Sequence, residues 1–344
     1  MQKHQQLKSS LFKLAQADGM PGAETTAAEV AKGELEKFMQ VEKDVLGNVV
    51  GKIGGKGPHI LLDAHLDQIG LIVTAIDEKG FIRFDRCGGA DVRVLPAHEV
   101  LVWGEKTLYG LVCSMPPHLT KAESAGKAKP ADELAIDVGM DKKSLSKIVK
   151  PGDRISLKGP QGELLGGRVF SPTLDDRAGV ASVLRCLEIL KDKEHGCRLT
   201  VLFSTQEETS GSGAKVASYK AEADEAIAVD VSFACAPGLL KEKCADLGGG
   251  TMVGVAPTLD RGMSKDLINL AQRENIPYQV EVMGGRTGTN ADSIQNSGKG
   301  LKMALLSLPL RNMHTAVEVA DLEDIESTAR LMAAYILERG QENA

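Results

Sequence analysis

Four consecutive segments decide the fold: AGVASVLRCLEIL (178–190), RLTVLFST (198–205), SGAKVASYKA (212–221) and EAIAVDVS (225–232). The first and third space their apolar residues as a helix does, whereas the second and fourth are short apolar runs typical of buried strands. This alternation predicts a mainly parallel sheet with helices on both faces. It continues to the end of the chain, with helices expected over 263–275 and 321–340 and strands over 278–283 and 301–310.

The middle of the chain has a different pattern, with β-rich runs and turns in place of alternating helices and strands. IGLIVTAIDEKGFIRF (69–84) holds two β-rich runs around a polar turn, which indicates a hairpin, and EVLVWGEKTLYGLVCSM (99–115) repeats the pattern. Residues 69–168 are therefore predicted to form an inserted small β-barrel-like domain. The two chain ends, residues 1–68 and 169–344, are predicted to combine into one α/β domain.

Composition excludes several classes of function. A length of 344 residues suggests about two domains, and a hydrophobic share of 42% supports a sizeable core. With only 3% aromatic residues and a net charge of −6, the chain is not expected to bind nucleic acid or anionic membranes. The start is polar, no apolar run approaches the ~20 residues of a membrane helix, and the six cysteines are scattered. These features are typical of a cytoplasmic protein.

Potential metal ligands follow the predicted strands. In open α/β sheets, ligands bind beyond the carboxyl ends of the strands, so residues at those ends should meet. Two histidines and several carboxylates at one edge suit a divalent ion. The candidates are His65 and Asp67 after ILLDA, Glu207 and Glu208 after LTVLFSTQ, Asp230 after AIAV, His314 after LSLPLRNM, and Asp175–Asp176 before the helix at 178–190.

Each of these pieces has a plain structural interpretation when taken alone. An Asp–Asp pair at a helix start most often caps the helix, and a Glu–Glu pair after a strand is often solvated. Because five separate elements deliver potential ligands to one edge of the sheet, a metal-binding or catalytic role is favoured over these structural interpretations. Two neighbouring ions need a shared carboxylate, and a further carboxylate outside the coordination shell can take a proton from water. At the turn after their strand, Glu207 and Glu208 can both reach the site, one as base and one as ligand.

The order of these motifs resembles metallopeptidase family 42, the co-catalytic aminopeptidases that assemble as tetrahedral shells. The similarity runs from about residue 45 to residue 340, and it extends to SMPPHL (114–119) and GRTGTNAD (285–292). The motifs that carry it are DAHLDQIG (63–70), LDDRAG (174–179), STQEE (204–208), AVDVS (228–232) and PLRNMHTAVE (309–318).

The resemblance implies a ligand set for two divalent ions per subunit, zinc or cobalt. His65 and Asp230 match the terminal ligands of one ion, and Glu208 and His314 match those of the other. Asp175 matches the carboxylate that bridges the two ions.

The resemblance also implies roles outside the ligand set. Glu207 matches the general base, and Asp67 the carboxylate that orients the ligating histidine. The resemblance further implies a cis peptide bond between Asp175 and Asp176, as is typical of this family. The β-rich insert matches a dimerisation domain, which implies a homo-oligomer, a dodecamer built from dimers. The substrates implied are peptides, from which N-terminal residues are removed.

Other functions remain open at this point. Another two-metal amide hydrolase, such as a deacylase or carboxypeptidase, would use the same ligands; a metal-free glycosidase using Glu207 and a second carboxylate is a weaker alternative, as is a scaffold without catalysis. The preferred N-terminal residue is not indicated, although Arg261, Arg286 and Arg311 could each favour an acidic side chain. Asn290, where the family often has Asp, and the segment 209–212 depart from the family pattern and bear on specificity.

Overall fold

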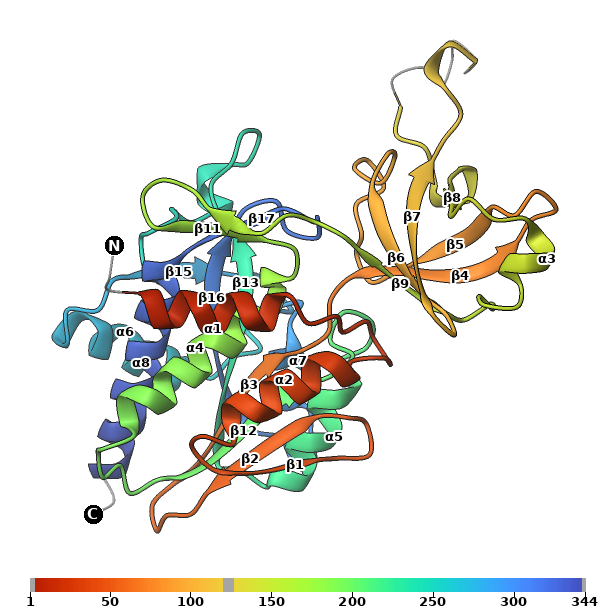
Figure 1. Cartoon of the computed structure of the whole chain (residues 1–344). Helices are drawn as coiled ribbons and strands as arrows, with labels where there is room; N and C mark the ends of the chain where they lie inside the picture. The colour runs from red at the N-terminus through yellow and green to blue at the C-terminus, as the bar shows by residue number, and fades with distance from the viewer. Residues whose placement is uncertain (1–3, 120–126, 342–344) are drawn as a thin grey trace.

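The computed structural model describes residues 4–119 and 127–341 as two lobes (Figure 1). A mixed eight-stranded sheet forms the middle of the larger lobe, in the order β1-β2-β12-β3-β13-β16-β14-β15. The four strands β12, β3, β13 and β16 run parallel, β1 and β2 extend them antiparallel on one side, and the parallel pair β14–β15 joins β16 antiparallel on the other. The strands are β1 (Gln40–Lys43), β2 (Val49–Ile53), β3 (His59–His65), β12 (Arg198–Ser204), β13 (Glu225–Phe233), β14 (Thr251–Val255), β15 (Tyr278–Val282) and β16 (Lys302–Leu310).

Helices cover both faces of this sheet. On one face, α4 contacts the strands β3 and β13, and α8 packs beside it on β14 and β16. The helices α1, α2 and α6 complete this side. On the other face, the shorter helices α5 and α7 pack on β12, β13 and β16. The helices are α1 (Gln5–Ala15), α2 (Thr25–Leu35), α4 (Leu174–Leu190), α5 (Ser212–Ala221), α6 (Arg261–Arg273), α7 (Asn290–Gln295) and α8 (Leu322–Gln341).

The central strands are apolar because both of their faces are covered. In β3, every residue from Ile60 to His65 is buried, and β13 is buried from Glu225 to Val231. Complete burial of a leucine or isoleucine side chain stabilises the fold by about 1.5–3 kcal/mol, so these runs hold the sheet between its helical layers. Buried polar residues in such strands are exceptional. Asp63 and His65 lie toward the carboxyl end of β3 and Asp230 toward that of β13, whereas Glu225 begins β13.

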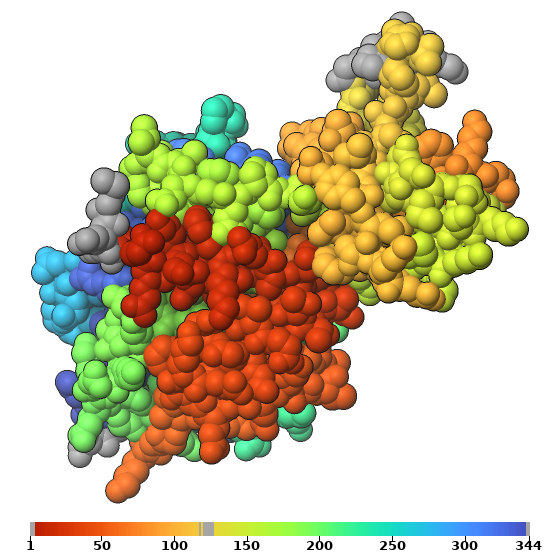
Figure 2. All heavy atoms as spheres, in the orientation of Figure 1, coloured from red at the N-terminus to blue at the C-terminus, as the bar shows by residue number. Residues whose placement is uncertain are grey.

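The smaller lobe is a closed six-stranded barrel in the order β4-β5-β8-β7-β6-β9. All its strand pairs are antiparallel, and it has its own apolar core. Figure 2 shows the barrel standing beside the larger lobe, to which it is joined at one side. The barrel elements are β4 (Gly70–Ile76), β5 (Ile82–Cys87), β6 (Glu99–Trp103), β7 (Thr107–Cys113), β8 (Ala135–Asp137), α3 (Lys142–Leu145) and β9 (Arg154–Leu157).

The chain returns from the barrel through a three-stranded antiparallel sheet. β10 (Gly162–Glu163) pairs with β11 (Arg168–Ser171), and β11 pairs with β17 (Glu318–Asp321). This small sheet places the start of α4 beside the segment that follows β16. The predicted fold class, a mainly parallel α/β sheet with an inserted barrel-like unit, is confirmed.

Candidate metal centre

The parallel strands at the middle of the sheet deliver the candidate residues to one edge. β3 ends at His65, and its neighbour β12 ends at Ser204, which lies beside His65 in the register. Asp230 lies on β13, the other neighbour of β3, and His314 follows the end of β16 by four residues. Side chains separated by up to 249 positions therefore meet at this edge.

A first group of potential ligand atoms comes from His65, Asp175 and Asp230, and these atoms all lie within 4.8 Å of one another. Nε2 of His65 lies 3.0 Å from Oδ1 of Asp175 and 3.9 Å from Oδ1 of Asp230. Nδ1 of His65 donates to the carbonyl oxygen of Asp67 at 3.1 Å. That bond turns Nε2 toward the two carboxylates, the orientation that a metal-binding histidine needs.

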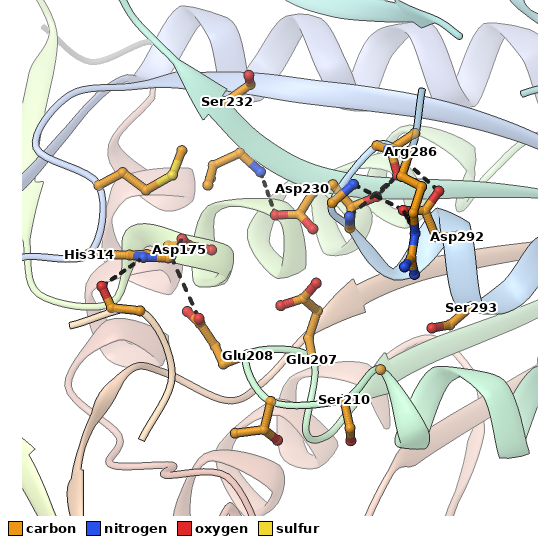
Figure 3. A pocket seen from close by; sticks show the side chains of 18 of the residues that line it. Asp175, Glu207, Glu208, Ser210, Asp230, Ser232, Arg286, Asp292, Ser293 and His314 are labelled. Atoms are coloured by element: carbon orange, nitrogen blue, oxygen red, sulfur yellow. Dashed lines mark hydrogen bonds and ion pairs between the residues drawn. The ribbon is translucent and has the colours of Figure 1, made fainter. Parts of the chain in front are cut away.

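A second group comes from Asp175, Glu208 and His314, again within 4.8 Å (Figure 3). Nε2 of His314 lies 3.4 Å from Oδ2 of Asp175 and 3.6 Å from Oε2 of Glu208. Its Nδ1 donates to the carbonyl oxygen of Gly89 at 3.2 Å. Asp175 belongs to both groups, and its two carboxylate oxygens face two different histidines.

Asp67 holds the turn that carries the two glutamates. This turn follows β12, and the fully buried carboxylate of Asp67 accepts hydrogen bonds from the backbone N–H groups of Glu207 (2.9 Å) and Glu208 (3.0 Å). The same carboxylate lies 3.6 Å from Nδ1 of His65. Figure 3 shows the side chains of Glu207 and Glu208 rising from this turn toward the other candidate ligands. Asp67 therefore contacts the glutamate turn as well as the histidine.

The two aspartates at the start of α4 divide the structural and chemical tasks. Asp176 accepts a hydrogen bond from the N–H of Gly179 at 3.0 Å, which caps the helix, and another from the N–H of His65 at 3.1 Å. A Cβ at Gly179 would lie 2.3 Å from Oδ1 of Asp176, so the close approach of this carboxylate requires glycine. The Asp175–Asp176 peptide bond is cis, as the family resemblance implies, and Asp175 faces the centre.

The electrostatics of the centre favour a cation. Burial would lower the pKa of His65, but the carboxylates beside it raise that pKa well above its usual range. Burial, reinforced by neighbouring negative charges, raises the pKa values of Glu208 and Asp230 well above the usual range and that of Glu207 to about 7. Oε1 of Glu208 is buried and has no hydrogen-bond partner among the described residues. A divalent ion would relieve this excess of negative charge, so the donor set fits one.

An open pocket adjoins the centre and is lined on its far side by the loop 286–289. Asp292 shapes this loop, because its carboxylate accepts from the N–H groups of Thr287 (3.1 Å) and Gly288 (3.0 Å) and lies 3.5 Å from Nε of Arg286. Of the three arginines proposed from the sequence, Arg286 lines the pocket. Nε of Arg311 donates instead to a backbone carbonyl, a structural contact.

The two departures from the family pattern occupy different places. Thr209, Ser210 and Gly211 line the pocket, so this segment bears directly on what the pocket accepts. Asn290 is buried, and its Nδ2 donates to Oδ2 of Asp63 (3.0 Å) and to the hydroxyl oxygen of Ser204 (2.8 Å). Asn290 thus ties α7 to the ends of β3 and β12.

Comparison with known proteins identifies the family. The family model of the M42 glutamyl aminopeptidases matches residues 47–331. The chain belongs to this family. It is 33% identical over 305 residues to the lysyl aminopeptidase of Pyrococcus furiosus, with 87% of each chain covered. This M42 protein is therefore an aminopeptidase, a metal-dependent hydrolase, which confirms the enzyme class predicted from the motifs.

Solved structures agree with this assignment. An aminopeptidase of Desulfurococcus kamchatkensis superposes with a TM-score of 0.91 at 30% identity, covering 98% of this chain and 97% of its own. The TET1 peptidase of Pyrococcus horikoshii gives a TM-score of 0.85 at 31% identity, covering 96% and 99%. Within residues 4–119 and 127–341, no helix has both the length and the apolar character to cross a membrane.

Two residues that contact the centre, Glu318 and Gly89, were not predicted from the sequence. Glu318 accepts hydrogen bonds from the backbone N–H groups of Asp175 and His314, although it lies in a small sheet away from the main strand ends. Gly89 comes from the barrel side of the chain and contacts His314 through its carbonyl. A single sequence does not show that residues so far apart touch.

The contact with Gly89 leads to a testable expectation. A Cβ at this position would lie 2.3 Å from Nδ1 and 2.6 Å from Cε1 of His314, so Gly89→Ala should displace the imidazole. We expect kcat/KM to fall by about 10–100-fold, the usual effect of disturbing a group that orients a metal ligand. Gly54→Ala is the matched control, because a Cβ at Gly54 meets nothing within 4 Å. Equal activity of the two variants would show that the position of His314 is unimportant.

Proposed function

We propose that this aminopeptidase works with two divalent metal ions, zinc or cobalt, held at the edge of the sheet. His65, Asp175 and Asp230 would hold one ion, and Asp175, Glu208 and His314 the other. The observation that carries the proposal is the placement of Asp175, whose two oxygens lie 3.0 Å and 3.4 Å from the Nε2 atoms of two different histidines. When bound, such ions lower the pKa of a water molecule and polarise the carbonyl of the scissile bond.

The chain's own residues would supply the proton transfers. Glu207 lines the pocket, and its backbone is held by Asp67. We assign its carboxylate as the general base: it accepts the proton of the attacking water at an oxygen and gives it to the nitrogen of the leaving amine. Asp67 is assigned as the group that orients His65 and the glutamate turn. Each catalytic cycle therefore returns Glu207 to its starting protonation state.

The substrate would be a peptide whose N-terminal residue occupies the pocket between the centre and the loop 286–289. The named relatives differ in that residue, because the family model is described as glutamyl and the Pyrococcus furiosus enzyme as lysyl. The decisive experiment is a panel of glutamyl-, lysyl- and leucyl-chromophore substrates, each assayed with added zinc, cobalt or manganese. Release of the N-terminal residue supports the proposal. Cleavage only of acylated amino acids, C-terminal residues or glycosides would replace it with one of the alternatives.

We also propose that the enzyme forms a large homo-oligomer in the cytoplasm. One similar solved structure is a TET1 dodecamer, and the TET1 peptidase of Pyrococcus horikoshii can assemble into a tetrahedron or a large octahedral shell. In our proposal the six-stranded barrel is the dimerisation module, because its β7 exposes Tyr109 and Leu111 on one face.

Light scattering provides the test of assembly. A dodecamer has twelve times the 36.6 kDa of the chain, about 440 kDa. Replacing Tyr109 and Leu111 together with glutamate should shift the particle toward smaller species, because charges are unfavourable in the core of an interface. A paired exchange of exposed Lys56 and Glu222 for alanine serves as control. A wild-type chain that is monomeric at micromolar concentration would contradict the assembly but leave the chemistry intact.

A further inference from the structure

Glu318 connects the two parts of the chain that supply the second group of ligand atoms. It is the first residue of β17, and its side chain turns inward to the start of α4. Oε2 accepts the backbone N–H of Asp175 at 2.9 Å, and Oε1 accepts the backbone N–H of His314 at 3.0 Å. One carboxylate therefore holds the main chain of a residue at the start of a helix and of another in a loop 139 positions later.

Glu318 is buried, and the backbone hydrogen bonds that it accepts are shielded from solvent. The residue is only 1% exposed, so no solvent replaces these hydrogen bonds when they are lost. Each of its two oxygens accepts from a backbone N–H, so both donors lose their partner when this side chain is removed. The arrangement matches that of Asp67, which accepts from the two neighbouring N–H groups of Glu207 and Glu208 on the other side of the centre. Two buried carboxylates thus fix the backbone from which the candidate ligands project.

The backbone of His314 has an uncommon conformation. Its φ is 61°, in the left-handed region, which few residues other than glycine adopt, although histidine, asparagine and aspartate enter it more often than the rest. The N–H held by Glu318 and the Nδ1 bonded to Gly89 are the two contacts that set the direction of the imidazole. With both in place, Nε2 faces Asp175 and Glu208.

We infer that Glu318 is a positioning residue that sets the affinity of the second metal site, the one formed by Asp175, Glu208 and His314. This inference rests on the proposed function. Glu318 holds two of the three members of the second group but only one member, Asp175, of the first. Loss of its hydrogen bonds should therefore weaken the second site much more than the first.

The test is metal binding, measured by calorimetric titration of the metal-free protein with Co²⁺ and by the visible spectrum of the bound ion. In Glu318→Gln, one side-chain oxygen becomes an NH₂ group, which cannot accept from a backbone N–H. We expect one of the two binding steps, the step that His314→Ala also weakens, to lose about 10–100-fold in affinity, the usual effect of removing a partner outside the coordination shell, while the other step changes by less than about threefold. Glu225→Gln is the matched control, because Glu225 is also a buried carboxylate but pairs with Arg339 at the start of β13.

A double-variant cycle with His314→Ala separates positioning from general stability. If Glu318 acts through His314, adding Glu318→Gln to His314→Ala should cost little further affinity, whereas independent effects would add. The inference is overturned if Glu318→Gln binds both ions like the wild type, weakens both steps equally, or behaves like Glu225→Gln. A wild-type chain that fails to bind two ions instead overturns the proposed function, and with it this inference.

Discussion

Replacing Glu207 with glutamine is expected to lower kcat by about 10²–10⁴-fold, the range associated with loss of a general acid–base group. Glutamine preserves the size and the hydrogen-bonding capacity of the side chain but cannot accept a proton at neutral pH. Because Asp67 holds the N–H of residue 207 through the backbone, that contact survives the change. The metal content of the variant should therefore stay near that of the wild type, so that the loss falls on the chemical step.

Glu208→Gln is the neighbouring comparison. Oε2 of Glu208 lies 3.6 Å from Nε2 of His314, within the second group of ligand atoms, and a neutral amide binds a divalent ion more weakly than a carboxylate. This variant should lose occupancy of one site. Elemental analysis of both purified variants beside their kinetics decides the roles. If Glu207→Gln loses an ion and Glu208→Gln keeps both, the assignments are exchanged, and if neither loses activity, the pair is not catalytic.

Removal of metal is expected to abolish hydrolysis while leaving the fold largely intact. The candidate ligands come from five separate elements, each anchored by its own core contacts, so the sheet does not depend on the ions for assembly. Excess chelator should bring activity to the background level, with far-UV circular dichroism little changed. Added zinc or cobalt should restore activity. Full activity in excess chelator would exclude the two-metal mechanism.

Asp175→Asn is the genetic counterpart of chelation. Asp175 is the one residue common to both groups of ligand atoms, so this change should reduce the occupancy of both sites. Bound ions stabilise the charge of the transition state by several kcal/mol, so their loss should lower kcat/KM by about 10³-fold or more. Asp260→Asn is a suitable control, because Asp260 caps α6 at the opposite edge of the sheet. Because asparagine caps a helix about as well as aspartate, that control should change neither the stability nor the metal content appreciably.

Much of the fold could be predicted because local pattern and global position agree. The buried run HILLDAH and the apolar EAIAVDVSF are strands covered on both faces, and a hydrophobic run of this kind has few other places in a protein. The hairpin around Asp77–Gly80 follows from turn chemistry, since Gly80 adopts a φ of 90°. The candidate ligands could be predicted from the sequence for a related reason, because parallel strands bring their carboxyl ends to a common edge.

Contacts between segments that are distant in the sequence could not be predicted in the same way. Taken alone, the residue types of an Asp–Asp pair suit either a helix cap or a metal ligand. The family resemblance assigned Asp175 to the centre, and the packing shows in addition that Asp176 caps the helix. Likewise, the pairing of Arg286 with Asp292 and the burial of Asn290 depend on how α7 packs on the sheet. Such contacts follow from the relative placement of elements, which periodicity does not encode.

The alternating α/β fold, the inserted β-rich unit and the residue types gathered at the strand ends follow from the sequence, because periodicity and strand-end position are local properties of the chain. Which carboxylate oxygen faces which histidine, and which buried groups hold them, depends on how the elements pack. Glu318 and Gly89 contact the centre from a separate small sheet and from the barrel side of the chain. The contacts of Glu318 exist only once β17, α4 and the loop after β16 have packed together, and that of Gly89 only once the barrel segment lies beside this loop.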